Sequence, residues 1–207
     1  VIPNRRQETH VVRMPLAFET PLRTGNLRAP NGPQTTFAGE SFIDELGAAA
    51  GADPVDFRLK LLQGSTDDDN QFKRARSIAV VRASAEEFGW DRRPSPKQLD
   101  TGSILTGRGI AYCYRGQTVI AEIAEVEVNR ETGHVWVKRI ACAQDCGLVI
   151  NPVGVRNTAE GNLLHGLSRA LCEEGQFDKE KGTSVDWNPH PTLRHPDAPD
   201  KNDDERG

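Results

Sequence analysis

The sequence lacks several features that would place it in a function class at once. It has no run of about 18 apolar residues, so no segment is predicted to span a bilayer. Its first ten residues, VIPNRRQETH, contain no apolar core of the kind that a secretory signal peptide needs. They also lack an initiator methionine, and we expect the chain to begin inside a longer protein.

Positive charge and apolar residues are both scarce. The 26 Lys and Arg residues are outnumbered by 30 Asp and Glu residues, and the formal net charge is −4. Binding to nucleic acid or to an anionic membrane depends on clustered basic residues, so we expect neither as a partner. Apolar residues make up 36% of the 207, below the roughly 45–50% of average domains. We therefore expect part of the core to belong to a surface against which this chain packs.

The chain has few cysteines, and they do not form metal-binding pairs. The four are Cys113, Cys142, Cys146 and Cys172, with no CxxC spacing. Cys142 and Cys146 lie four apart in a strand-like run, where their side chains would be about 13 Å apart, too far for one metal or one disulfide. We predict reduced, packed thiols and no metal site, and therefore a reducing, cytoplasmic compartment.

Known catalytic motifs are also missing. The chain has no Walker A, GxSxG or HExxH motif, and the stretch TGRGIAY lacks the third glycine of a dinucleotide fingerprint. Its five histidines are scattered without metal-ligand spacing. The sequence alone therefore predicts no catalytic residue.

Helical patterns dominate the first half of the chain. Apolar residues recur at helical spacing from Thr36 to a stop at Gly51. The stretch Asp53-Pro54-Val55-Asp56 then predicts a capped helix start, and that helix ends at Gly64. A third helix is predicted over residues 71–88.

The second half changes to strand periodicity. Residues 118–129 and 134–143 alternate apolar and polar positions around an NRETG turn, which predicts an antiparallel hairpin with a one-residue phase slip near Ala124. The stretch GRGIAYCY predicts a preceding strand, and a long helix follows Asn151-Pro152.

This order of elements predicts an α+β fold: a helical segment, then an antiparallel β-meander and a long helix. We predict four segments. They are a cofactor-turn and helical segment over residues 1–90, a linker over 91–105, a β-meander plus helix segment over 106–196, and a polar tail over 197–207.

In two stretches of the sequence, the backbone is expected to be able to come close to another group. RAPNGPQ at 28–34 is a turn that exposes amide groups near a helix start, a geometry that favours anionic or polar groups. Residues 143–166 leave a strand, turn, and enter a helix that contains the small residues Gly161 and Gly166. Ordinary helix packing and approach to a cofactor explain these glycines equally well.

These stretches resemble the molybdenum-binding large subunit of the xanthine dehydrogenase and aldehyde oxidase family, above all its isoquinoline 1-oxidoreductase beta-like branch. The shared motifs, in family order, are IPN, LRAPNGPQ, FAGESFIDELGAAAGADPVDFRLKLL, AEVEVNRETGHVWVKR, DCGLVINP, RNTAEGNLLHGLSRALCEE and TSVDWNPHPTLRHPDAP. Together they cover nearly the whole chain. The resemblance implies that the α+β fold is part of a molybdenum-binding domain.

The resemblance also implies a cofactor, partners and site residues. The cofactor is molybdopterin with molybdenum, in its cytosine dinucleotide form, shared with the rest of the subunit. A partner subunit carries a [2Fe-2S] cluster, and the substrate is an N-heterocycle or an aldehyde that is oxidised with oxygen from water. Relatives in this branch are sometimes exported, so the periplasm is the alternative compartment. The matching cofactor-binding positions are Arg28, Ala29, Asn31, Asn157 and Thr158.

Three departures from the family pattern limit what the resemblance implies. Thr158 stands where the family usually has a pterin-binding Gln, and Pro30 stands where purine-oxidising relatives carry an aromatic residue. The family's catalytic glutamate lies in a Gly-rich motif that we expect beyond Gly207, and so we expect the chain to be inactive alone. Two interpretations follow: a portion of a molybdenum hydroxylase large subunit, or a non-catalytic truncated remnant that acts only as a folded or interaction module.

Overall fold

The computed structural model describes residues 6, 8–10, 29–64, 72–97, 101–186, 190–194 and 198–199. The described residues fall into two compact units. The first holds residues 31–149, and the second holds residues 150–198 together with Ala29 and Pro30.

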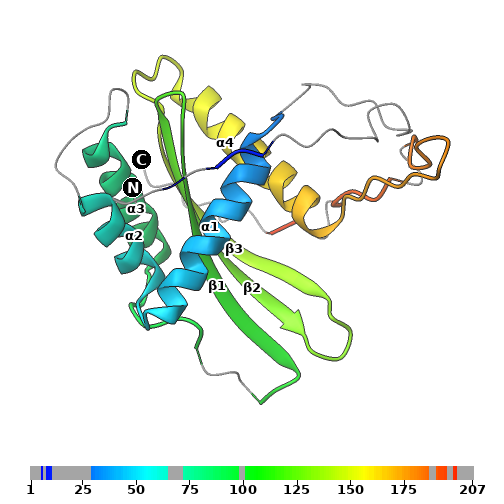
Figure 1. The fold of residues 1–207 in the computed structure, drawn as a ribbon, viewed down its shortest axis with the longest axis horizontal. Helices are drawn as coiled ribbons and strands as arrows, with labels where there is room; N and C mark the ends of the chain where they lie inside the picture. Colours follow the sequence, from blue (N-terminus) through cyan, green and yellow to red (C-terminus); the bar gives the residue numbers. More distant parts are fainter. Residues whose placement is uncertain are drawn as a thin grey trace. The chain divides into compact units, whose positions relative to one another are not determined.

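Three helices and three strands build the first unit (Figure 1). They are α1 (Gly32–Ala49), α2 (Pro54–Gln63), α3 (Arg74–Phe88), β1 (Ile104–Arg115), β2 (Thr118–Asn129) and β3 (Val135–Asp145). The second unit contains one long helix, α4 (Pro152–Leu171). This order confirms the predicted α+β class, with helices first, then a meander, then a long helix. No helix among the described residues is long and apolar enough to cross a membrane.

The three strands form one antiparallel sheet in the order β1-β2-β3. A two-residue turn joins β1 to β2, and both of its residues, Gly116 and Gln117, have positive φ. Such a turn matches the right-handed twist of the flanking strands. Between β2 and β3 the register shifts at Glu125/Val126, which leaves Lys138 as one extra residue in β3. The sequence predicts a phase slip in β2 near Ala124, whereas the extra residue is in β3, opposite the step that follows Glu125.

One face of the sheet packs against α2 and α3 to form the hydrophobic core of the first unit. The core consists of Val55, Leu59, Leu62, Val80, Val81, Phe88, Ile110, Val119, Ala121, Ile123 and Ala141. Buried residues alternate with less buried ones at Val119, Ala121 and Ile123 because successive side chains of a strand point to opposite faces.

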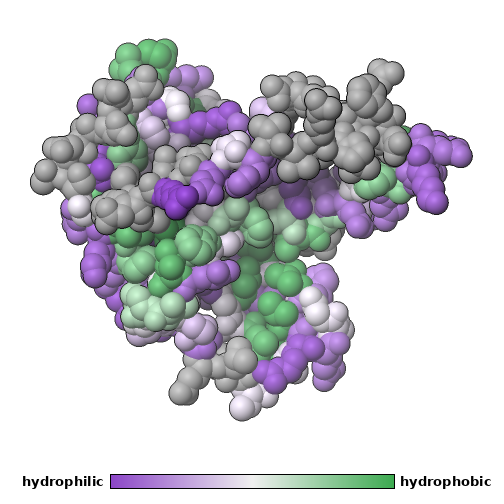
Figure 2. All heavy atoms as spheres, viewed as in Figure 1, coloured by the Kyte–Doolittle hydropathy of each residue, from purple (hydrophilic) through white to green (hydrophobic). Residues whose placement is uncertain are grey.

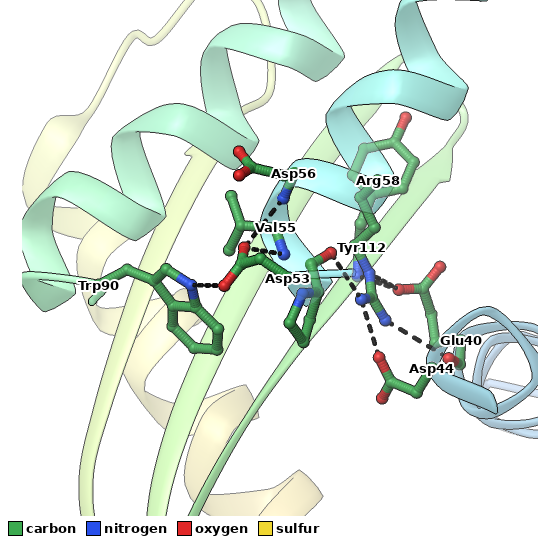
Figure 3. Close-up of polar contacts among 9 residues, drawn as sticks. Glu40, Asp44, Asp53, Val55, Asp56, Arg58, Trp90 and Tyr112 are labelled. Carbon is green, nitrogen blue, oxygen red and sulfur yellow. Dashed lines mark hydrogen bonds and ion pairs between the residues drawn. The ribbon is translucent and has the colours of Figure 1, made fainter. Parts of the chain in front are cut away.

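The start of α2 is fixed by a buried carboxylate. Asp53 is the N-cap, and its Oδ1 accepts hydrogen bonds from the amides of Val55 (2.9 Å) and Asp56 (3.0 Å). Its Oδ2 accepts a hydrogen bond from Trp90 Nε1 at 2.9 Å (Figure 3). The same oxygen accepts the amide of Arg93, also at 2.9 Å. One side chain therefore caps α2 and also anchors the segment that follows α3.

A buried guanidinium ties α1 to α2 (Figure 3). The side chain of Arg58, 4% exposed, pairs with Glu40 (2.9 Å) and with Asp44 (2.8 Å) on α1. Glu40 Oε2 also accepts the amide of Tyr112 on β1 at 2.8 Å. A charge so deeply buried is tolerated because each partner is hydrogen-bonded. Helices α1 and α2 and strand β1 are thus joined by one polar network.

Candidate functional site

The first candidate region is the turn that precedes α1. Ala29 has φ 49, in the left-handed region where residues other than glycine are uncommon. The N-cap of α1 is Asn31, and its side chain makes no capping hydrogen bond. The first turn of α1 contains no acidic residue. The amide groups at this helix start therefore remain available to a polar or anionic group.

A cationic side chain lies against this helix start. A Cβ placed on Gly32 would come within 2.5 Å of Arg115 Nη1, so the end of the flexible Arg115 side chain lies directly against Gly32. Arg115 is the last residue of β1. It adds positive charge where the helix dipole is already positive, and a bound anion would compensate both.

Contacts along α1 fix its start relative to the end of β1. Thr36 Oγ1 lies 3.5 Å from Cys113 Sγ, one helical turn past Gly32. One turn further along, Glu40 accepts the amide of Tyr112. Three successive turns of α1 therefore contact β1, which explains why Arg115 meets Gly32.

The second candidate region begins where β3 ends. Asp145, the last residue of β3, forms a two-pronged ion pair with Arg76 of α3, with distances of 2.6 Å to Nε and 2.7 Å to Nη2. The amide of Gly147 donates to Asp145 Oδ1, and Gly147 has φ 82. The ion pair with Arg76 and this amide lower the pKa of Asp145 to about 2. Asp145 therefore stays charged and holds the chain in the turn that leaves β3.

Helix α4 follows in the second unit. Asn151 Oδ1 caps it by accepting the amide of Gly154 at 3.0 Å. Asn157 and Thr158 lie next to each other on its second turn, and both are exposed. The hydroxyl of Thr158 donates to the carbonyl of Gly154 at 2.8 Å, so its proton is already used within the helix.

The five residues predicted as cofactor-binding are distributed over the two units. Asn31 lies in the first unit at the start of α1, whereas Asn157 and Thr158 lie together on α4 in the second unit. Ala29 also falls in the second unit, and Arg28 lies outside the described residues. Their roles in binding stay predictions.

Sequence reasoning missed two arginines that shape these regions. Arg115 was not singled out, although it ends the strand that approaches α1. Arg76 was assigned no role, although it fixes Asp145 of the DCG stretch. Both contacts join residues more than 65 positions apart, and no local pattern in the sequence signals such a pairing.

The far face of the sheet holds two titratable groups, on β2 and β3, whose pKa values are raised. Glu122 of β2 is opposite Cys142 of β3 in the register. Burial raises the pKa of Glu122, and burial together with the Glu122 carboxylate raises the pKa of Cys142 to about 11. A thiol with so high a pKa is a poor nucleophile near neutral pH. Among the residues that the structure describes, no group of three or more His, Cys, Asp or Glu side chains could hold a metal ion.

The geometry at the start of α1 fits a group with polar or anionic edges, such as the phosphate and pterin of molybdopterin. Hydrogen-bond donors at the start of α1 come from three sources: the free amides, the exposed Asn31 side chain and the Arg115 guanidinium. The fit is weaker on α4, because Thr158 has a short side chain whose proton is committed to Gly154.

Comparison with known proteins identifies a family for most of the chain. Residues 48–191 match the family model described as a molybdopterin cofactor-binding domain. The match includes α4 with Asn157 and Thr158, and it begins after Ala29 and Asn31.

Individual relatives point in the same direction. The chain is 36% identical over 198 residues to the B subunit of nicotinate dehydrogenase from Pseudomonas putida, which is 91% of this chain and 16% of that protein. It is 36% identical over 166 residues to the beta subunit of isoquinoline 1-oxidoreductase from Brevundimonas diminuta, covering 80% and 20% of the two chains. It is 31% identical over 197 residues to a membrane-bound aldehyde dehydrogenase [pyrroloquinoline-quinone] of Gluconacetobacter polyoxogenes, covering 91% and 25%. The chain thus spans a quarter or less of the length of these relatives.

Proposed function

The chain belongs to the molybdopterin cofactor-binding domain family, and from this premise we propose that it forms one part of the large subunit of a molybdenum hydroxylase. The relatives named after nicotinate, isoquinoline and aldehyde oxidation support an oxidoreductase with an N-heterocyclic or aldehyde substrate. The role proposed for this chain is to bind the cofactor.

The observation that carries the proposal is the arrangement at the start of α1. An uncapped helix N-terminus and a close Arg115 together provide hydrogen-bond donors and positive charge for an anionic cofactor. When bound, molybdopterin supplies the redox chemistry of its molybdenum. In the first unit, Asn31 and the α1 amides would be donors to it. The proposed roles of Asn157 and Thr158, which lie on α4 in the second unit, come from the family resemblance alone.

The finer features of the proposal come from the family resemblance. We propose the cytosine dinucleotide form of the cofactor, a separate small subunit that carries a [2Fe-2S] cluster, and a shared site completed by the remaining part of the large subunit. Turnover is expected only in that assembly, since the chain spans 16–25% of the length of the three relatives. Arg28, Ala29, Asn31, Asn157 and Thr158 are the proposed cofactor-binding residues, and no catalytic residue is assigned.

The test is the molybdenum and pterin content of the chain after co-expression with a candidate iron–sulfur subunit and the rest of a large subunit. Asn31→Ala is expected to lower both contents by removing a donor beside the α1 amides. Thr158→Gln is expected to raise them, because glutamine reaches beyond the helix, where threonine bonds back to Gly154. Arg92→Gln, which alters an exposed arginine paired with Asp56, is the control and should change neither content.

Two results would contradict the proposal. The first is molybdenum bound equally by the parent chain, Asn31→Ala and Thr158→Gln. The second is a folded chain that assembles with its partners and contains no molybdenum. The second result would favour the alternative interpretation of a non-catalytic module, for which the committed hydroxyl of Thr158 is the supporting observation.

A further inference from the structure

A separate pocket lies in the first unit, between the start of α2, the segment after α3 and the start of β1. Its volume is about 220 Å³. The lining residues are Pro54, Trp90, Arg93, Ser95, Pro96, Lys97, Leu105, Thr106, Gly107 and Arg108. Three of these are cationic and none is acidic, which is unusual for a chain whose net charge is −4.

The cationic side chains of this pocket are held in place by specific contacts. The Arg108 guanidinium lies 3.8 Å from the centroid of the Trp90 ring and donates to the carbonyl of Asp91. Lys97 Nζ donates to Thr106 Oγ1 at 2.8 Å. The side chain of Arg93 pairs with Asp91, with 3.6 Å between Nε and Oδ2, and its backbone amide donates to Asp53, which also accepts a hydrogen bond from Trp90. The positive groups are therefore arranged before any ligand arrives, which reduces the entropic cost of binding.

Among the residues that the structure describes, three acidic groups lie near these cations. Asp53 already accepts four hydrogen bonds, and Asp91 is an exposed partner 3.6 Å from Arg93 Nε. Glu125 is opposite Arg108 in the register but lies 3.7 Å from Arg139. Burial, followed by repulsion from Arg93, lowers the pKa of Arg108 despite these acids. An anion in the pocket would relieve that repulsion.

The lengths of two elements show that this pocket lies apart from the proposed cofactor region. Helix α1 has 18 residues and is about 27 Å long, and Asn31 is at one end while α2 and Pro54 follow the other end. Along β1, Arg108 and Arg115 are seven residues apart, or about 24 Å. The pocket is therefore a second site.

We propose that this pocket binds the phosphate group of a small phosphorylated ligand. Two guanidinium groups and one ammonium group converge there with the hydroxyls of Ser95 and Thr106. These groups offer more donors than the two oxygens of a carboxylate can use, and they suit the three or four oxygens of a phosphate. Trp90 and Leu105 provide an apolar wall for the rest of the ligand. This inference does not depend on the proposed redox function.

The test is titration of the chain, prepared without molybdopterin, with inorganic phosphate at constant ionic strength, followed by calorimetry and by tryptophan fluorescence. Trp90 lines the pocket and should report binding. Arg93→Gln removes a lining charge while leaving its backbone bond to Asp53 intact, and it should weaken phosphate binding by at least about tenfold. The neighbouring Arg92→Gln removes the same charge outside the pocket and should change the affinity by less than about twofold.

Succinate, a dicarboxylate, is the comparison ligand and should bind more weakly than phosphate. Equal weakening by Arg93→Gln and Arg92→Gln would overturn the proposal, because it would show a general effect of surface charge. Succinate binding as tight as phosphate binding would overturn it too, as would the absence of any heat or fluorescence change with phosphate. Lys97→Gln provides a second lining variant if Arg93→Gln fails to fold, and its expected effect is the same.

Discussion

At the scale of single residues, two serines on one helix have opposite environments. Ser77 and Ser84 of α3 are both fully buried. Ser77 Oγ donates to the carbonyl of Lys73 and accepts the hydroxyl of Tyr112 at 2.7 Å. Ser84 Oγ has no hydrogen-bond partner among the described residues. Since a buried hydroxyl without a partner costs free energy, the two positions should respond oppositely to alanine.

We expect Ser84→Ala to raise the free energy of unfolding by about 1 kcal/mol, because it removes an unsatisfied hydroxyl and increases helix propensity. Ser77→Ala should lower it by roughly 1 to 2 kcal/mol, because Tyr112 loses its acceptor. Urea unfolding followed by circular dichroism measures both. A loss of stability in Ser84→Ala would show that its hydroxyl has a partner in solution.

The ion pair at the end of β3 predicts a specific pH dependence. The pKa of Asp145 is lowered to about 2 by Arg76 and by the amide of Gly147. Its contribution to stability is therefore present above the ordinary carboxyl pKa of about 4 and is lost as the pH falls toward 2. We expect Asp145→Asn to be less stable than the parent chain at pH 6, and the difference should shrink between pH 4 and pH 2. Urea midpoints across this range measure it, with the exposed Glu131→Gln as the control. A difference that stays constant with pH would exclude the ion pair as its cause.

At the scale of elements, the start of α2 depends on one side chain. Asp53 is buried and accepts four hydrogen bonds, two that cap α2 and two that hold Trp90 and Arg93. We expect Asp53→Ala to lower the free energy of unfolding by about 3 kcal/mol, since a cap is lost and buried donors lose their acceptor. Asp56→Ala, in the first turn of the same helix, should cost less than about 1 kcal/mol because Asp56 is half-exposed and pairs with Arg92. Thermal or urea unfolding of the two variants compares them, and equal losses would contradict the proposed role of Asp53.

The elements themselves were largely predictable from local sequence. The Asp53-Pro54 start predicted α2, which begins at Pro54, and the alternation around NRETG predicted the β2–β3 hairpin. The phase slip predicted near Ala124 of β2 lies close to the register shift at Glu125/Val126, but the extra residue itself is Lys138 in β3. These features depend on residues close in the chain, where caps, turns and periodicity act.

The contacts that shape the candidate site were not predictable in this way. Arg115 beside Gly32 and Arg76 beside Asp145 join distant positions. The residues RAPNGPQ predicted the turn at 28–34, but not the Arg115 guanidinium that lies beside the helix start. Charged side chains serve equally well on a solvated surface, so composition and periodicity alone do not assign them to a partner.

At the scale of the whole molecule, several large apolar side chains are exposed (Figure 2). Phe37 on α1 is 76% exposed, and Leu148 after β3 is 88% exposed. If the chain is one part of a larger subunit, such residues are expected to contact the remainder of that subunit. Contact with the remainder of a subunit would also explain the low apolar content of 36%, because part of the core would then come from that remainder.

We expect Phe37→Ser and Leu148→Ser to change the free energy of unfolding of the isolated chain by less than about 0.5 kcal/mol, because both side chains are already in water. The same variants should weaken association with the rest of a large subunit in a pull-down assay. Ile123→Ser, a fully buried position, is the contrasting variant and should unfold the chain. Unchanged association in both exposed variants would show that these surfaces lie outside the assembly.

The bond between Glu40 and the amide of Tyr112 also bears on aggregation. Strand β1 is at the edge of a three-stranded sheet, and an unprotected edge offers its amides to strands of other molecules. Glu40 occupies the amide of Tyr112, three residues before the end of β1, and places a carboxylate at that edge. A foreign strand would have to displace this carboxylate and leave Arg58 with fewer partners. The network that joins α1, α2 and β1 thereby also hinders the growth of intermolecular sheets and fibres from this edge.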